Sequence, residues 1–368
     1  MTEEKTPPES SEKKSRKEAP KGKAKVKAKA KDVEPPSFVL SSSPHLRTRE
    51  SIESAMYMVV LALVPALIGG IVFFGFDAIR VTLWCIAGTL AFEFISLKAR
   101  GVQAFRPTLF DGSAIVTGLL LALNLPSGAP WWLCVAGAFV AMVIAKHVFG
   151  GLGSNPFNPA LVARIFLLIA WPAQMTRWPI PNFAPEGVGA SPDAVTAATP
   201  LSVLGTDGLA DMQEKYSTLN VLIGNVGGCI GETSAILLLL GGLFLIWRGV
   251  IRWHIPLAYI LSFGLLSAVF WLINPDRFAD PIFHIAAGGL MIGAFFMATD
   301  YTTSPLSAKG MLVFGVGCGV LTFVIRYFGS FPEGVSFSIV IMNAFTPLID
   351  RKFVPKRFGI ETTSAQAA

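Results

Sequence analysis

The sequence predicts an all-α polytopic membrane protein with about ten transmembrane helices in two inverted five-helix repeats. The first observation is composition. Of the 368 residues, 52% are hydrophobic and only 15% are charged, too few to cover the surface of a soluble protein of this length. The second observation is a series of apolar segments, and the third is the distribution of basic residues among the loops that join them.

The apolar segments make up most of the chain after residue 50. They lie at 55–75, 80–97, 112–125, 131–149, 160–172, 219–247, 256–273, 282–299, 310–326 and 335–349. Most approach the roughly 20 residues that cross a bilayer as a helix. Two of them, 112–125 and 160–172, are short, and 219–247 is interrupted by glycines. Such spans often carry irregular backbone that lines a site.

Composition also predicts the division of the chain. Residues 1–36 are rich in Lys, Glu, Pro and Ser, so we expect a disordered basic tail that contacts anionic lipid and not nucleic acid. A first five-helix half should follow at 37–172, then an external loop at 173–218. The second half should occupy 219–359, and 360–368 should form a short disordered tail.

Loop charges predict the orientation. Most loop Lys and Arg fall in 98–106, 146–159, 248–254, 298–309 and 350–357, which places both termini in the cytoplasm and the loop at 173–218 outside. A weak repeat supports the symmetry, because glycines and prolines in 112–172 recur in 288–348. Five spans per half is an odd number, so the second half would be inserted upside down.

Four acidic residues are candidates for an ion path: Glu93, Asp111, Glu232 and Asp300. Ionisable groups at membrane depth are costly to bury, which makes them functional candidates. Asp111 and Asp300 lie near segment ends, where a helix cap or an interfacial anchor is the commoner role. Glu93 and Glu232 lie deeper, and there a structural role and an ion-path role are equally supported. The sequence lacks closely spaced Cys or His pairs, so no metal site is predicted.

The segment GGLGSNPFNP at 150–159 joins two apolar segments. Gly151 and Gly153 would let the backbone approach a planar ligand, and Asn155 and Asn158 offer donors and acceptors to a ring edge. An ordinary Gly/Pro turn that starts a helix explains the same pattern. The residues alone favour that second interpretation.

The long polar loop contains DAVTAATPLS at 193–202. Its small residues, two threonines and a proline predict an exposed, turn-prone segment with free hydroxyls at Thr196 and Thr199. Such a segment is a poor core and a plausible attachment point.

Several stretches carry a family resemblance. They are 42–47 (SSPHLR), 110–118 (FDGSAIVTG), 150–164 (GGLGSNPFNPALVAR), 296–301 (FMATDY), 331–334 (FPEG) and 342–350 (MNAFTPLID). Together they closely resemble the D subunit of the Rnf electron-transport complex, of which the B subunit of the Na+-translocating NADH:quinone oxidoreductase is a near relative. The resemblance covers about residues 37–359 and leaves out the basic tail.

The resemblance implies covalently bound FMN. In that family a phosphoester joins FMN to the last threonine of a Ser/Thr-Gly-Ala-Thr motif, which matches 196–199 (TAAT) and assigns the flavin to Thr199. Ala197 stands where the family usually has glycine, which adds a methyl group to the segment that the attaching enzyme must recognise. A second, non-covalent flavin (riboflavin or FMN) is also implied, and Asn155 and Asn158 then become its candidate contacts.

The resemblance further implies an oxidoreductase subunit of a bacterial inner membrane, active only within its complex. That complex would move electrons between ferredoxin and NAD while driving Na+ or H+ across the membrane. NADH and iron–sulfur sites should lie on other subunits, which include a periplasm-facing flavoprotein, and no catalytic side chain is expected here. A non-redox solute channel or transporter suits inverted repeats and membrane carboxylates equally well, and a purely structural membrane anchor for the complex is a third interpretation.

Overall fold

A computed structural model describes residues 51–101, 108–183, 198–206, 208–232, 234–329 and 334–354, which belong to one compact unit. The described residues contain helices and no strand. Both predicted tails, residues 42–47, Thr196 and Ala197 lie outside the described ranges, as do residues 331–333. The expected disorder of the tails therefore stays a prediction.

The helices of the first part of the chain are α1 (Ile52–Phe74), α2 (Phe76–Ala99), α4 (Ser113–Leu123), α5 (Trp131–Phe139), the π-helical turn η1 (Val140–His147), α6 (Pro159–Ala170) and α7 (Pro172–Met175). The middle contains α8 (Pro200–Thr206), α9 (Leu209–Lys215), α10 (Thr218–Ile223) and the 3-10 turn η2 (Ile230–Glu232). The last part contains α11 (Ala235–Trp247), α12 (His254–Ile273), α13 (Pro281–Ala286), α14 (Leu290–Ile292), the π-helical turn η3 (Gly293–Met297), α15 (Ala308–Phe328) and α16 (Val335–Lys352).

Four of these helices are long and apolar enough to cross a membrane: α1, α2, α12 and α15. Shorter apolar helices are α4, α6, α11 and the continuous stretch Trp131–His147. This pattern is consistent with a polytopic membrane protein. The count of ten spans and their inverted symmetry stay predictions.

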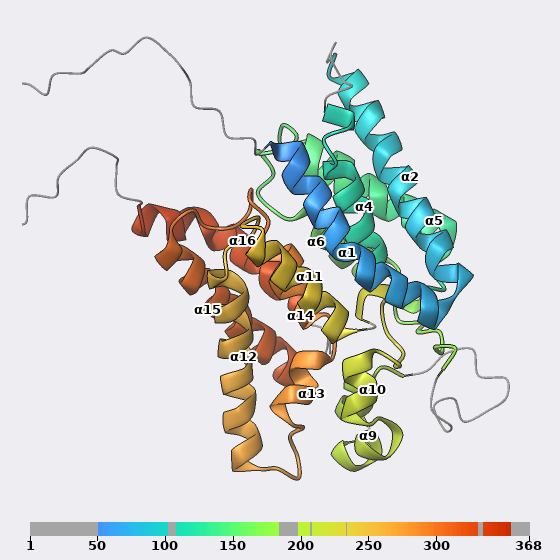
Figure 1. Cartoon of the computed structure of the whole chain (residues 1–368), viewed down its shortest axis with the longest axis vertical. Helices are drawn as coiled ribbons and strands as arrows, with labels where there is room; N and C mark the ends of the chain where they lie inside the picture. The colour runs from blue at the N-terminus through green and yellow to red at the C-terminus, as the bar shows by residue number, and fades with distance from the viewer. Residues whose placement is uncertain are drawn as a thin grey trace, which may run out of the picture. The chain divides into compact units, whose positions relative to one another are not determined.

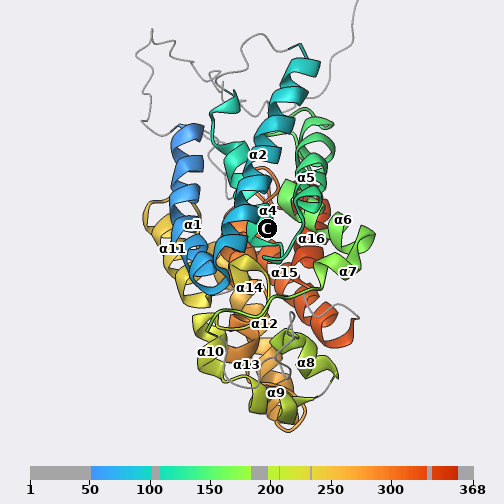
Figure 2. The same cartoon turned by 90° about the vertical axis from the view of Figure 1, so that its right-hand side faces the viewer.

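In the first part of the chain α2 packs against α4 and α5, and in the last part α12 packs against α15 and α13. The contacts that join the two parts include α1 against α11 and α6 against α16 (Figures 1 and 2). Small residues allow the close approach, because a Cβ atom on Gly241 of α11 would overlap the backbone oxygen of Ala62 in α1.

Glycines break two of the predicted spans. The segment 219–247 is interrupted as its glycines predicted: α10 ends at Gly224, which has a φ of 98°, and η2 precedes α11. The segment 282–299, which was expected as one helix, is also broken. Gly288 and Gly289 have φ values of 67° and 63°, a conformation that stops α13 before α14 begins.

The polar loop folds back onto the last part of the chain. Helices α8 and α9 pack on each other, and α10 contacts α13 (Figure 2). The Tyr216 hydroxyl donates to the carbonyl oxygen of Ala198 at 2.6 Å, and Leu201 and Val203 are buried in the apolar core. The described part of the loop is therefore anchored by packing just after Thr199.

Candidate functional site

Two cavities contain the residues of interest. The first, which we call the asparagine cavity, has apolar walls that include Met56, Val59, Leu120, Leu245, Phe295 and Phe296. Its polar lining includes Ser113, Lys146, Asn155, Asn158, Asp300 and Thr302. An apolar cavity with a few convergent polar groups is the usual form of a small-molecule or cofactor site.

The two asparagines play different parts in this cavity. Asn158 is the N-cap of α6: its Oδ1 accepts hydrogen bonds from the N–H groups of Ala160 (3.1 Å) and Leu161 (3.4 Å), and its Nδ2 donates to the Met297 carbonyl oxygen. Asn155 donates from Nδ2 to the Phe157 carbonyl oxygen at 3.1 Å. The Oδ1 of Asn155 is buried and has no hydrogen-bond partner among the described residues. Asn155 therefore has an acceptor left for a ligand.

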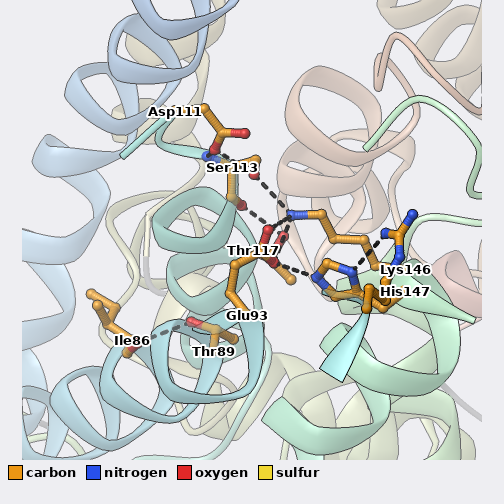
Figure 3. A network of polar contacts seen from close by, with 9 residues as sticks. Ile86, Thr89, Glu93, Asp111, Ser113, Thr117, Lys146 and His147 are labelled. Atoms are coloured by element: carbon orange, nitrogen blue, oxygen red, sulfur yellow. Dashed lines mark hydrogen bonds and ion pairs between the residues drawn. The ribbon is translucent and has the colours of Figure 1, made fainter. Parts of the chain in front are cut away.

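A buried charged cluster stands behind the cavity wall (Figure 3). The Lys146 Nζ lies 2.9 and 3.1 Å from the two carboxylate oxygens of Glu93, and 2.9 Å from the Ser113 Oγ. The His147 Nε2 lies 2.9 Å from Glu93 Oε2, and its Nδ1 lies 3.4 Å from the Arg100 guanidinium. Arg100 can only donate, so Nδ1 accepts and Nε2 carries the proton given to Glu93. Glu93 thus accepts from two side chains of η1.

The π-helical turn explains why Lys146 and His147 both reach Glu93. Hydrogen bonds from i+5 to i replace the α-helical pattern at the end of η1, with the Val148 N–H donating to the Val143 carbonyl oxygen at 3.0 Å. The Gly151 N–H donates to the Lys146 carbonyl oxygen in the same pattern at 3.1 Å. Such turns are rare and are found mostly at functional sites.

Two of the predicted acids cap local turns. The Asp111 Oδ1 accepts from the Ser113 N–H at 2.8 Å and from its Oγ at 2.6 Å, at the start of α4. The Asp300 Oδ2 accepts from the hydroxyls of Thr302 (3.0 Å) and Thr303 (3.3 Å) in the turn before α15. Burial raises the pKa of the Asp300 carboxyl, and these hydrogen bonds oppose the shift.

The second cavity, which we call the threonine cavity, is lined by Thr199, Leu201, Val226, Gly227, Glu232 and Gly288. Thr199 directly precedes α8 and is only 5% exposed, so the expectation of an exposed residue with a free hydroxyl was wrong. Its Oγ1 accepts from the Ser202 N–H at 3.1 Å. The segment is buried because the neighbouring side chains of Leu201 and Val203 pack in the apolar core.

A neighbouring groove continues from the threonine cavity, since Leu201 lines both. Its other walls include Leu204, Phe278, Tyr327, Arg277 and Arg326. The Arg326 guanidinium donates to the carbonyl oxygens of His284 (2.6 Å) and Gly288 (2.9 Å), which holds together the break between α13 and α14. Gly288 is favoured there by its φ of 67°, and a Cβ atom would also meet the Leu201 side chain.

A chain of polar contacts joins the two cavities. The Arg164 Nη2 lies 3.6 Å from Glu232 Oε1 in the threonine cavity, and its Nη1 donates to Asn124 Oδ1 at 2.6 Å. Asn124 contacts the sulfur of Met297 at 3.8 Å, and the Met297 carbonyl oxygen accepts from Asn158 at 3.2 Å. The chain thus ends at a residue of the asparagine cavity.

The structure therefore groups most of the predicted residues around these two sites. Asn155, Asn158 and Asp300 line the asparagine cavity. Glu93 contacts Lys146 and Asp111 contacts Ser113, and both of these partners line the same cavity. Thr199 and Glu232 line the threonine cavity.

The two predicted glycines do not line the asparagine cavity. A Cβ atom on Gly151 would lie 3.0 Å from the Arg100 guanidinium, so this glycine leaves room for Arg100 beside His147. A Cβ atom on Gly153 would have no neighbour within 4 Å, although its φ of 90° favours glycine.

Sequence reasoning missed the roles of Lys146, Arg164 and Asn124. Lys146 and Arg164 carried a usable signal, since each is a cation in or beside an apolar segment. Asn124 gave none, because its partners come from distant parts of the chain.

Comparisons with known proteins show which family the chain resembles. The model of the NQR2, RnfD, RnfE family matches residues 39–359. The D subunit of the proton-translocating ferredoxin:NAD(+) oxidoreductase complex of Clostridium ljungdahlii is 44% identical over 327 residues, which are 88% of this chain and 96% of that protein. The D subunit of the Na(+)-translocating ferredoxin:NAD(+) oxidoreductase complex of Acetobacterium woodii is 44% identical over 333 residues, covering 90% and 98%. The D subunit of the ion-translocating oxidoreductase complex of Stutzerimonas stutzeri is 43% identical over 331 residues, covering 84% and 93%.

Proposed function

The chain belongs to the NQR2, RnfD, RnfE family, and we propose that it is the D subunit of an ion-translocating ferredoxin:NAD oxidoreductase complex that relays electrons through FMN bound covalently to Thr199. The observation that carries the proposal is the position of Thr199. Its hydroxyl lies at the wall of a cavity, on a segment that packing with the last part of the chain holds in place. A group attached there would be held against the protein and not on a free loop.

The hydrogen bonding at Thr199 is compatible with a phosphoester. Forming the ester replaces the hydroxyl proton and keeps the oxygen, so Oγ1 still accepts from the Ser202 N–H. The adjoining groove offers Phe278 and Tyr327 as aromatic walls and Arg326 as a nearby cation. Bound FMN would supply the electron-transfer chemistry, while these residues would set its position and surroundings.

We assign the second, non-covalent flavin, riboflavin or FMN, to the asparagine cavity. Its orphaned acceptor on Asn155 meets the need of a ring edge that carries an N–H donor, and Phe295 and Phe296 offer apolar surface to a planar ring. Asn158 contributes chiefly by fixing the start of α6. The contacts of this site therefore differ from the expectation that both asparagines bind through their side chains.

The polar chain between the cavities supports a path for charge through the protein. Glu93, Asp111, Glu232 and Asp300 all lie on or just behind the two cavity walls, and we assign them to the ion path. The named coupling ion differs between relatives, being the proton in Clostridium ljungdahlii and Na+ in Acetobacterium woodii. The protein would lie in a bacterial inner membrane with both termini cytoplasmic and Thr199 on the periplasmic side, beside lipid, the other members of the complex and a periplasm-facing flavoprotein.

In-gel fluorescence tests the covalent flavin. The wild-type chain, made with its attaching enzyme in flavin-replete cells, should fluoresce after denaturing electrophoresis. Thr199→Val should abolish the fluorescence of the band while the protein still inserts into membranes. Thr176→Val, in the same predicted external loop but outside the motif, is the matched control and should fluoresce like the wild type. A dark wild-type band would exclude the phosphoester.

A further inference from the structure

Lys146 is the one lysine among the described residues that lines either cavity. Its side chain is 2% exposed, and it comes from the π-helical turn η1. Electrostatic interactions are screened less in the protein interior than in water. The groups around a buried ammonium therefore decide whether its charge stabilises or destabilises the protein. Its surroundings therefore decide what it does.

The hydrogen bonds of Lys146 keep its charge at the cavity wall. The Nζ is held by Ser113 Oγ at 2.9 Å, and Ser113 itself lines the cavity. The Glu93 carboxylate lies 2.9 Å from the same Nζ and also accepts from His147. Lys146 lines the cavity and Glu93 does not, so the positive end of this ion pair is the end nearer to the cavity. Whatever occupies the cavity is therefore closer to the ammonium than to the carboxylate.

The rest of the cavity makes that field effective. Its walls on the other sides are largely apolar, with Leu120, Phe295 and Phe296 among them. Few dipoles are therefore present to screen a charge at Lys146. The one carboxylate in the lining is that of Asp300, which is held by Thr302 and Thr303.

We propose that Lys146 sets the reduction potential of the flavin held in the asparagine cavity, and that Glu93 adjusts how much of its charge the flavin experiences. This inference rests on the proposed second flavin. A positive charge in the wall stabilises the reduced, anionic ring over the neutral oxidised ring, and so raises the potential. The electrons come from the donor side of the proposed complex, and the accompanying proton comes from water. Lys146 is thus a positioning residue for electron transfer and loses no proton itself.

The test is a redox titration of the purified complex, followed by its absorption spectrum. Lys146→Met removes the charge and keeps the length of the side chain. It should lower the potential of the non-covalent flavin by an amount that changes its reduced-to-oxidised ratio at least tenfold, about 30 mV for a two-electron couple. Glu93→Gln removes the opposing charge and should shift the same potential upward. Lys146→Arg keeps the charge and should stay within about threefold of the wild-type ratio.

Two references separate a specific effect from damage. The covalent flavin in the same sample should keep its potential in every variant, because its site lies in the other cavity. Lys98→Met removes the same charge from an exposed position on α2, the helix that carries Glu93, and should leave both potentials unchanged. If Lys146→Met releases the non-covalent flavin, its potential cannot be measured in that variant. The role of Lys146 is then tested by Glu93→Gln, in which the potential of the non-covalent flavin should shift upward.

The outcomes are distinguishable. Three results would overturn the role of Lys146 while leaving the second flavin in place. The potentials could stay unchanged in Lys146→Met and Glu93→Gln, they could shift in the same direction in both variants, or both flavins could shift equally. A wild-type complex that releases no flavin on acid extraction beyond the covalent fraction would overturn the second flavin, and this inference with it. Opposite shifts confined to the non-covalent flavin would support both.

Discussion

The guanidinium of Arg164 lies 3.6 Å from the carboxylate of Glu232, so that α6 is joined to the 3-10 turn η2 by an ion pair with side chains only 6% and 8% exposed. The Arg164 side chain also donates to Asn124 and contacts the Cys229 sulfur at 3.4 Å. The pair therefore fixes the glycine-broken part of the chain against a regular helix.

Arg164→Leu should destabilise the protein by about 3–5 kcal/mol, because it removes the buried countercharge facing Glu232. Thermal unfolding of the purified protein measures the effect. Arg164→Leu combined with Glu232→Leu should recover part of the loss, since no carboxylate is then buried. The matched control is Arg80→Leu, whose partner Asp77 is half exposed and which should cost no more than about 1 kcal/mol. Equal losses at Arg164 and Arg80 would contradict the importance of the buried pair.

The two asparagines of the asparagine cavity should separate binding from stability. Asn155→Leu removes the unpartnered acceptor and should lower the non-covalent flavin released by acid, with little change in the covalent fraction. Asn158→Leu removes the cap of α6 and should destabilise the protein by about 0.5–2 kcal/mol. Flavin extraction and thermal unfolding on the same samples test the distinction. A fall in bound flavin in Asn158→Leu that equals the fall in Asn155→Leu, without loss of stability, would refute it.

Asp300 should make stability depend on pH. Burial raises its pKa in the folded protein, so its contribution to stability is fully present below the unfolded pKa of about 3.9 and is lost as pH rises through the folded pKa. The melting temperature of the wild type relative to Asp300→Asn should therefore fall across that window and become level above it. A difference that stays constant with pH would show that the carboxyl titrates alike in both states.

Close helix packing predicts a large effect at Gly241. Gly241→Val places a side chain against the Ala62 backbone and should push α11 away from α1, with a loss of about 1–3 kcal/mol or more. Gly205→Ala in α8 is the control, because a Cβ atom there has no neighbour within 4 Å. Unfolding midpoints compare the two. The contact between the helices would be unimportant if Gly241→Val unfolded like the wild type.

Much of the helical architecture was accessible from sequence, because a bilayer requires long apolar runs and these stand out in composition. The spans that became α1, α2, α12 and α15 were predicted at their correct positions. The interruption of the segment 219–247 at the glycines after α10 was also predicted from sequence. Gly288 and Gly289 were not, because nothing local distinguishes a glycine that packs in a helix from one that takes a positive φ. The positive φ values of the two glycines are visible only in the folded chain, where Gly288 lies against the distant Leu201 side chain.

The candidate sites were predictable in their residues more than in their roles. Asn155 and Asn158 share one motif, yet only contacts with Met297 and the start of α6 show that Asn158 is a cap. Glu93 was identifiable from sequence as a carboxylate that is costly to bury in a membrane. Its pairing with Lys146 was not, because the two residues are 53 positions apart. Thr199 was chosen by a motif, and its burial depends on hydrophobic neighbours in a segment that looks polar overall.

The π-helical turn at Val140–His147 makes the charged cluster sensitive to length as well as to residue type. A π turn accommodates one more residue than the α-helical turn it replaces, so deleting a single residue from it would restore regular helix. The residues after the turn would keep their direction, because the wide turn already absorbs the extra residue, whereas residues inside the turn would change position. Lys146 and His147 lie at the end of that turn, so their approach to Glu93 depends on its length. A member of the family with one residue fewer in η1 is therefore expected to have a different arrangement of this cluster, even where every charged residue is retained.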